Sequence, residues 1–140
     1  MMRYVDTSVL IAYLIPEPGS AAAEQFMLSS GEPLAISSWT EAELLSALGI
    51  KLRTGRLDMA GACDVIDSYN RLVAPNFTRL EIDEADHRQV IILLKGWRTA
   101  LRAGDALHLA IAAAHRATVY TLDRGMAAAA QTLGVPGMLL

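Results

Sequence analysis

The sequence contains a single cysteine, Cys63, so an internal disulfide is excluded. Because stable disulfides are a feature of oxidising compartments, this composition favours a cytoplasmic location. The chain is also too apolar to be disordered, since 53% of its residues are hydrophobic and only 19% are charged. A domain of this size buries roughly two-thirds of its unfolded surface and therefore needs neither disulfides nor structural zinc to fold.

Long apolar runs are also missing, because no uncharged stretch approaches the roughly 18 residues of a membrane span. The first 23 residues carry some features of a signal peptide, with an apolar run at 9–15 and alanines at 21–23. Asp6 ahead of that run, and Pro16 and Pro18 behind it, favour a folded strand and helix instead. We therefore expect a soluble, cytoplasmic protein without a membrane partner.

Aromatic residues and positive charge are both scarce, which limits how the chain can contact nucleic acid. Its 2 Trp, 4 Tyr and 2 Phe are too few for a surface of stacked rings that binds bases. Lys and Arg number 12 against 15 Asp and Glu, so the net charge of −3 repels phosphate overall. RNA binding therefore requires a local basic patch or bound cations. There is no G-x-G-x-x-G sequence or P-loop, which argues against dinucleotide and nucleoside triphosphate binding.

The chain does contain a regular alternation of short apolar strands and helices. The pattern predicts strands at residues 2–5, 33–37 and 118–122, with two further candidates at 75–80 and 135–140. It predicts helices at residues 9–15, 20–29, 38–55, 57–73, 83–96, 106–116 and 124–133. This order favours a parallel sheet of about four to five short strands covered by helices on both faces. We expect residues 1–140 to form one α/β domain.

Four acidic residues fall where such a fold builds its ligand sites. Asp6 and Asp123 each follow a predicted strand. Asp105 begins the alanine-rich helix at 106–116, and Glu43 lies early in the helix after the second strand. Ligands of open parallel sheets bind at the carboxyl ends of the strands, so these four side chains can gather at one edge. Taken singly, each aspartate also has a structural interpretation as a helix N-cap.

Spacing alone does not decide between two neighbouring glutamates. Ser38-Trp39-Thr40-Glu41 has the S-x-x-E form of a capping box, which gives Glu41 a structural role at the start of its helix. Glu43 has no such role, and its alternative interpretation is an exposed helical glutamate. The two side chains point to opposite sides of the helix, with Glu41 nearer the leucine stripe.

A cluster of these carboxylates must take up protons or bind a cation. Two carboxylates about 4 Å apart repel each other by about 4 kcal/mol at an effective dielectric constant of about 20. Oxygen donors without a Cys–His set suit Mg²⁺ or Mn²⁺ better than zinc. His108 lies three residues after Asp105, which allows a D-x-x-H metal pair. In so apolar a helix, however, a packed core histidine is the favoured interpretation.

Four segments resemble, in order, the motifs of the PIN-domain ribonucleases. The letters DTSVL at 6–10 resemble the D-T-S-x-L opening of that family, and SSWTEAEL at 37–44 resembles its second motif, whose acid aligns with Glu43. The letters LRAGDALHLA at 101–110 are very similar to the third motif, and TLD at 121–123 resembles the last. Order and spacing agree across essentially the whole chain, and its compact form is similar to the VapC-type toxins of toxin–antitoxin pairs.

The resemblance implies an endoribonuclease that hydrolyses RNA phosphodiester bonds with Mg²⁺ or Mn²⁺. It implies an acidic catalytic site in which Asp6 and Asp105 are metal ligands, with Glu43 and Asp123 as further candidates for ligands. It also implies a homodimer and a small antitoxin whose tail occupies the groove at the site. The alternative role within the family is a stand-alone RNA-processing nuclease.

Two other classes of protein use acidic residues on similar folds. In a phosphatase with a nucleophilic aspartate, Asp6 would form the phospho-enzyme, but such enzymes usually carry a second acid where Ser8 stands. A receiver-like signalling module would bind Mg²⁺ in an acidic pocket. It needs paired acids after the first strand and a lysine near the last, and the sequence has neither. Both classes are therefore less well supported than a nuclease.

Two surfaces could serve the implied partners. The helices at 9–15 and 20–29 offer an apolar groove for an amphipathic partner helix, which we expect to be formed by Leu10, Tyr13, Leu14, Phe26 and Met27. Basic residues lie in two clusters and beside Asp123, although solvated surface charge is their favoured interpretation; they are Lys51, Arg53, Arg56, Lys95, Arg98, Arg102 and Arg124.

Overall fold

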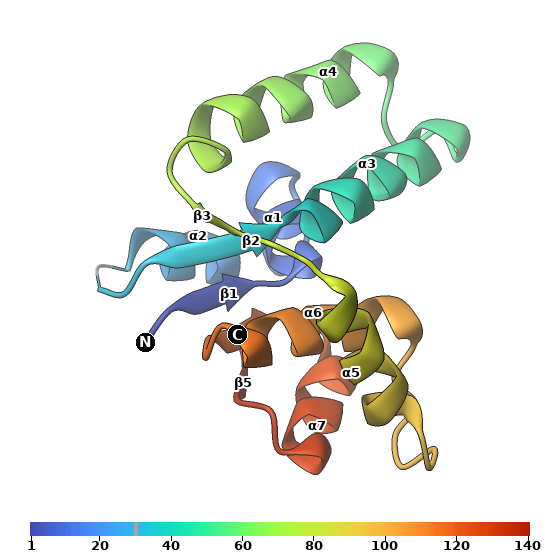
Figure 1. The fold of residues 1–140 in the computed structure, drawn as a ribbon. Helices are drawn as coiled ribbons and strands as arrows, with labels where there is room; N and C mark the ends of the chain where they lie inside the picture. Colours follow the sequence, from blue (N-terminus) through green and yellow to red (C-terminus); the bar gives the residue numbers. More distant parts are fainter. Residues whose placement is uncertain (30) are drawn as a thin grey trace.

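The computed structural model of the chain describes residues 1–29 and 31–140 and is built around a five-stranded parallel sheet (Figure 1). The strands lie in the order β3-β2-β1-β4-β5. Their bounds are β1 (Arg3–Val5), β2 (Leu34–Ser37), β3 (Thr78–Leu80), β4 (Thr118–Thr121) and β5 (Gly137–Leu139). The predicted α/β class is confirmed, and both candidate strands are present.

Helices cover both faces of the sheet, and each face has its own apolar core (Figure 1). One face carries α1 (Thr7–Leu14), α2 (Ser20–Leu28), α3 (Ser38–Arg53), α4 (Met59–Ser68) and the π-helical segment η1 (Tyr69–Val73). The other face carries α5 (Glu84–Leu94), α6 (Ala103–Ala114) and α7 (Arg124–Leu133). Successive strand residues point to opposite faces, so Tyr4 packs into one core and Val5 into the other.

The strand order places a topological switch point beside β1. From β1 the chain adds β2 and then β3 on one side, and it returns through α5 and α6 to place β4 on the other side of β1. The carboxyl ends of β1 and β4 are therefore neighbours, with the connections that leave them running to opposite faces. Ligand sites of open parallel sheets form at such a point.

Among the helices of the described residues, α6 is the most thoroughly buried. Every residue from Ala106 to Ala112 is buried, as its nearly uniform apolar character predicts. Burial comes from the sheet and neighbouring helices. Within the described ranges 1–29 and 31–140, no helix has the length and apolar character to cross a membrane.

The start of α3 differs from the prediction. Its capping box is formed by Ser37 and Thr40, because Ser37 Oγ accepts from the Thr40 amide at 3.4 Å and Thr40 Oγ1 accepts from the Ser37 amide at 3.2 Å. The predicted box of Ser38 and Glu41 is wrong. The extended backbone that an N-cap requires belongs to Ser37, the last residue of β2, so the helix starts one residue earlier than the S-x-x-E letters suggest.

The predicted helix at 57–73 is also divided in the structure. It begins with α4, which Asp58 caps by accepting from the Gly61 amide at 2.7 Å. The chain then continues as η1, where the backbone winds as a π-helix. Tyr69 and Val73 of this segment are buried in the core between α3 and the sheet.

Candidate metal centre

The four predicted acids line one pocket of about 280 Å³ at the carboxyl edge of the sheet. Asp6 lies between β1 and α1, and Asp123 between β4 and α7. Glu43 lies in the second turn of α3, and Asp105 in the first turn of α6. Two central strands and two helices from opposite faces therefore meet at the same pocket.

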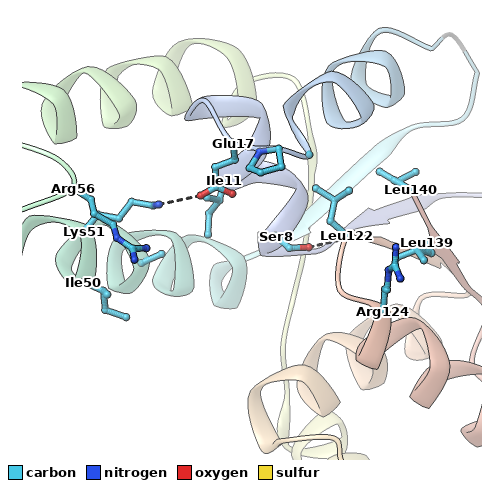
Figure 2. A pocket seen from close by; sticks show the side chains of 13 residues that line it. Ser8, Ile11, Glu17, Ile50, Lys51, Arg56, Leu122, Arg124, Leu139 and Leu140 are labelled. Atoms are coloured by element: carbon cyan, nitrogen blue, oxygen red, sulfur yellow. Dashed lines mark hydrogen bonds and ion pairs between the residues drawn. The ribbon is translucent and has the colours of Figure 1, made fainter. Parts of the chain in front are cut away.

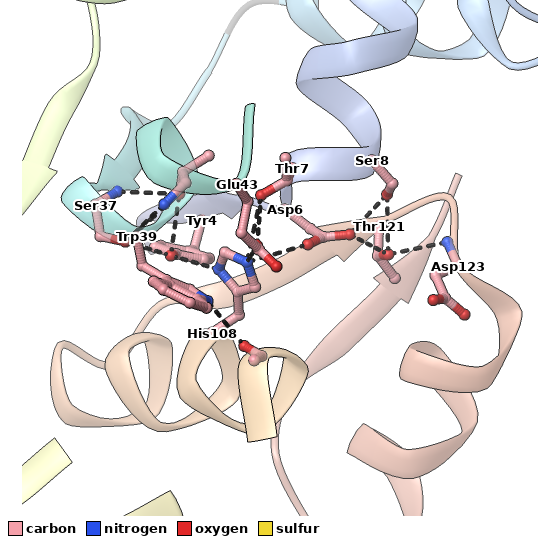
Figure 3. A network of polar contacts seen from close by, with 12 residues as sticks. Tyr4, Asp6, Thr7, Ser8, Ser37, Trp39, Glu43, His108, Thr121 and Asp123 are labelled. Carbon is pink, nitrogen blue, oxygen red and sulfur yellow. Dashed lines mark hydrogen bonds and ion pairs between the residues drawn. The ribbon is translucent and has the colours of Figure 1, made fainter. Parts of the chain in front are cut away.

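Asp6 is buried and held by hydroxyl groups. It precedes α1 in the N-cap position, but its side chain makes no cap hydrogen bond, so the structural alternative does not apply to it. Its Oδ2 instead accepts from Ser8 Oγ at 2.6 Å and from Thr121 Oγ1 at 2.8 Å (Figure 3). The second oxygen, Oδ1, lies 3.5 Å from His108 Nε2. These contacts fix the Asp6 carboxylate, with Oδ2 bound by the hydroxyls and Oδ1 beside His108.

Asp123 caps the helix that it precedes, whereas Asp105 does not cap its helix. Asp123 does cap α7, because its Oδ1 accepts from the Met126 amide at 3.1 Å, and it is exposed. Asp105 makes no cap contact, since it lies inside α6 after the N-cap residue Arg102. Burial raises the pKa of Asp105, and the nearby carboxylates raise it further, those of Asp6, Asp123 and Glu43 in that order. The acids are thus close enough to oppose one another's charge.

Glu43 is held in its ionised form by hydrogen bonds. Its Oε1 accepts from Thr7 Oγ1 at 2.8 Å and contacts His108 Nε2. Burial acts to raise the pKa of Glu43, but the interactions with His108 and Thr7 outweigh it and lower the pKa. Glu41 lies elsewhere, in an ion pair with Arg79 at 2.7 Å, so only Glu43 belongs to the cluster.

The environment of His108 was predicted only in part from the sequence. It is fully buried, as a core histidine would be, yet its Nε2 faces Asp6 and Glu43. The D-x-x-H spacing did signal that it shares a helix face with Asp105, but its closest partners come from other elements. Thr7 and Thr121 were also missed as supports for the carboxylates, and Ser8 supports Asp6 together with Thr121.

The donor set fits a divalent cation. Ligand atoms of Asp6, Glu43 and His108 all lie within 4.8 Å of one another, and Asp105 and Asp123 line the same pocket. A bound cation would relieve the electrostatic repulsion between these carboxylates. Carboxylate oxygens are hard donors, of the class that Mg²⁺ and Mn²⁺ prefer.

A larger pocket of about 670 Å³ adjoins the acidic one and shares Ser8, Ile11, Ala47 and Ile50 with it (Figure 2). Its apolar lining also includes Leu122, Leu139 and Leu140, and its charged lining comprises Glu17, Lys51, Arg56 and Arg124.

The apolar groove predicted on helices 9–15 and 20–29 is wrong for two of its five residues. Leu10 and Phe26 are core side chains with exposed fractions of 0% and 8%. Tyr13, Leu14 and Met27 pack against the same core and do not line the pocket beside the acids. The side chain of α1 that does line this pocket is Ile11, which lies on the opposite side of the helix from Tyr13.

Comparisons with known proteins agree with this architecture. A sequence profile described as PIN domain matches residues 3–131. The chain therefore belongs to the PIN domain family, and the predicted resemblance is confirmed. A search of curated protein sequences finds no match.

Several solved structures share the fold at low sequence identity. FitAcB from Neisseria gonorrhoeae is 21% identical, with a TM-score of 0.72 over 99% of this chain and 96% of that chain. VapC20 from Mycobacterium tuberculosis, described as a sarcin-ricin loop cleaving toxin, is 15% identical, with a TM-score of 0.72 over 91% and 94%. VapBC-5 from M. tuberculosis, described as a member of the VapBC family of toxin–antitoxin systems, is 22% identical, with a TM-score of 0.63 over 99% and 98%.

Proposed function

We propose that this PIN domain is a metal-dependent endoribonuclease, the toxin of a toxin–antitoxin pair. The observation that carries this proposal is the pocket in which Asp6, Glu43, Asp105 and Asp123 meet at the switch point of the sheet. Membership of the PIN family and the fold shared with VapBC proteins support the same function.

Each side chain has a distinct task in this proposal. Asp6 and Asp105 hold one or two Mg²⁺ or Mn²⁺ ions, and Glu43 and Asp123 add negative charge or further ligands. When bound, the cation supplies a water of lowered pKa and stabilises charge on the phosphodiester. Ser8 and Thr121 keep Asp6 oriented by donating hydrogen bonds to its Oδ2.

RNA can approach a chain of net charge −3 only where local cations offset the acids. The larger pocket beside the acids supplies them, because Lys51, Arg56 and Arg124 line it. Lys51 pairs with Glu17 at 3.0 Å, whereas Arg56 and Arg124 have no salt-bridge partner among the described residues. These two arginines support the approach of a phosphate backbone to the acidic pocket.

The same pocket supports an antitoxin as the partner. Its apolar lining of Ile11, Ile50 and Leu122 suits the apolar face of an amphipathic segment. An arginine of that partner would then reach the neighbouring carboxylates and compete with the cation. In this arrangement the antitoxin blocks metal and RNA together.

A homodimer is the proposed assembly of the free protein. Ile91 and Ile92 of α5 have exposed fractions of 65% and 63%, and Trp97 just beyond the helix has 91%. These exposed apolar side chains at the end of α5 form a surface that a second copy of the chain could bury. Light scattering gives the mass in solution, and a monomer would reject the dimer.

The deciding experiment is a cleavage assay on the purified chain, with and without the product of the neighbouring reading frame. We expect cleavage of unstructured RNA with Mn²⁺, none with EDTA and none by Asp6→Asn. Addition of the neighbouring product should inhibit, and extra Mn²⁺ should relieve the inhibition. A chain that is inert on every RNA tried, yet forms an aspartyl-phosphate with acetyl phosphate, would reject the nuclease in favour of a phosphatase or receiver module.

A further inference from the structure

A buried hydrogen-bonded chain beneath the acidic pocket ends at a nitrogen that faces two of the proposed ligands (Figure 3). His108 Nδ1 lies 2.7 Å from Tyr4 Oη, which in turn lies 2.8 Å from Ser37 Oγ. The other ring nitrogen, Nε2, contacts Glu43 Oε1 and lies 3.5 Å from Asp6 Oδ1. His108 and Tyr4 both have an exposed fraction of 0%, so water does not compete for these contacts.

The partners of the ring determine which nitrogen carries a proton. An ionised carboxylate only accepts hydrogen bonds, so the contact with Glu43 requires a proton on His108 Nε2. Thr7 Oγ1 donates to the same Glu43 oxygen at 2.8 Å, as expected for an acceptor with two lone pairs. Nδ1 then accepts from Tyr4 Oη. Were Nδ1 protonated as well, Nε2 would still be a donor without a lone pair for a metal.

We propose that His108 is a positioning residue, which holds the Glu43 carboxylate through a protonated Nε2 and does not itself ligate the ion. This inference rests on the proposed metal-dependent function. Glu43 and Asp6 repel each other, and the hydrogen bond from a ring anchored on Tyr4 keeps the Glu43 carboxylate beside Asp6. The ion is then held by oxygen atoms alone, which favours Mg²⁺ or Mn²⁺ over zinc.

The protonation pattern can be tested in the metal-free protein. Ring ¹⁵N chemical shifts separate protonated from bare nitrogens, and the chain has only 3 histidines. His108→Gln identifies the relevant signals by their loss. We expect a protonated Nε2 in the metal-free protein, retained after Mg²⁺ is added. A bare Nε2 in either state would overturn the inference.

Direct ligation can be tested with Mn²⁺ in the absence of RNA. Electron spin-echo envelope modulation detects nitrogen bound to Mn²⁺, and we expect no such histidine coupling. A coupling that disappears in His108→Gln would overturn the inference and leave the metal-dependent function standing. If Mn²⁺ does not bind at all, the proposed function fails, and the ring shifts of the metal-free protein still decide the protonation of His108.

Two substitutions separate a positioning residue from a ligand. His108→Gln places an N–H donor near the position of Nε2 and should retain most of the Mn²⁺ affinity. His108→Leu removes the donor and should weaken Mn²⁺ binding by about 10–100-fold. His115→Gln is the matched control, because His115 is the exposed C-cap residue of the same helix and should leave the affinity unchanged. Equal losses in the Gln and Leu variants would overturn the inference.

Discussion

Asp6 and Asp123 occupy equivalent positions after adjacent strands, yet their carboxylates are held in different ways. Two hydroxyls hold Asp6 in a buried position, and neither of its oxygens serves the helix that follows. Asp123 is exposed and gives one oxygen to the first turn of α7. Metal ligation would therefore compete with helix capping at Asp123 but not at Asp6, so we expect Asp6 to be the stronger ligand of the two in the proposed site.

The two neighbouring glutamates should respond differently to the same change. Glu43→Gln keeps the shape of the side chain but removes a charge from the acidic pocket, so turnover should fall by about 100-fold or more. Glu41→Gln removes only an ion pair with Arg79 in which both side chains are at least 40% exposed. It should leave RNA cleavage intact and cost less than about 1 kcal/mol of stability. Steady-state cleavage and urea unfolding check the pair, and the reverse pattern would assign the site to Glu41.

Asp105 should make stability depend on pH in the metal-free protein. Burial, followed by the charges of Asp6, Asp123 and Glu43, raises its pKa. Because the folded pKa lies above the unfolded one, stability falls as the pH rises from the unfolded pKa to the folded pKa, and the full penalty of ionising Asp105 is present above the folded pKa. Asp105→Asn should therefore raise the melting temperature at neutral pH in EDTA, and the gain should shrink as the pH falls through the raised pKa and be absent below the ordinary pKa of aspartic acid.

The control for Asp105 is Asp67→Asn, which changes an exposed carboxylate on α4 and should not alter the melting curve at either pH. A lower melting temperature for Asp105→Asn at neutral pH would mean that the carboxylate has a stabilising contact in the folded state. That result would contradict the view of the four acids as a mutually repelling cluster.

At this scale the sequence predicts which acids meet, but not what supports them. The acids follow strand ends or begin helices, and those positions are readable from local patterns. His108 is different, because its partners Tyr4 and Glu43 lie 104 and 65 residues away along the chain. No local pattern records that a buried tyrosine faces one nitrogen of the ring and a glutamate the other.

At the scale of elements, the first turn of α3 links the sheet to the acidic pocket. Ser37 ends β2, caps α3 and contacts Tyr4 Oη at 2.8 Å, so one side chain joins three features. The position of Glu43 depends on this turn, because Glu43 lies little more than one turn into the same helix. An error in the start of α3 would rotate Glu43 away from Asp6.

The two serines at this boundary give a direct test of where α3 begins. Ser37→Ala removes the N-cap and should cost about 1–2 kcal/mol in urea unfolding. Ser38→Ala, the matched control, changes an exposed serine inside the helix and should cost less than about 0.5 kcal/mol. A larger loss for Ser38→Ala would restore the capping box that the S-x-x-E letters predict.

Strands and helices were predictable in number and order because apolar periodicity and turn residues mark them. Their boundaries were less so, as the division of 57–73 into α4 and η1 shows. The π-helical winding buries Tyr69 and Val73 against the sheet, and this packing depends on the position of residues far away in the sequence. Local propensity cannot anticipate it.

At the scale of the whole molecule, the site lies where the two cores meet the edge of the sheet. Asp6 follows the central strand β1. Glu43 lies on α3, which covers one face of the sheet, and Asp105 lies on α6, which covers the other. Repulsion among these acids therefore acts across both halves of the fold. A cation that joins them stabilises the folded chain as a unit, since the unfolded chain holds no such cluster.

Mn²⁺ should therefore raise the melting temperature of the whole domain. At a free concentration 100 times the Kd, a ligand specific for the folded state adds about 2.7 kcal/mol, or about 5–10 °C for a domain of this size. Asp6→Asn should remove most of the shift, because Asp6 is buried in the pocket and held there by two hydroxyls. Glu81→Gln, an exposed change remote from the pocket lining, should retain the full shift. Differential scanning calorimetry in EDTA and in millimolar Mn²⁺ provides the measurement, and superimposable curves for the unaltered chain would contradict the metal centre itself.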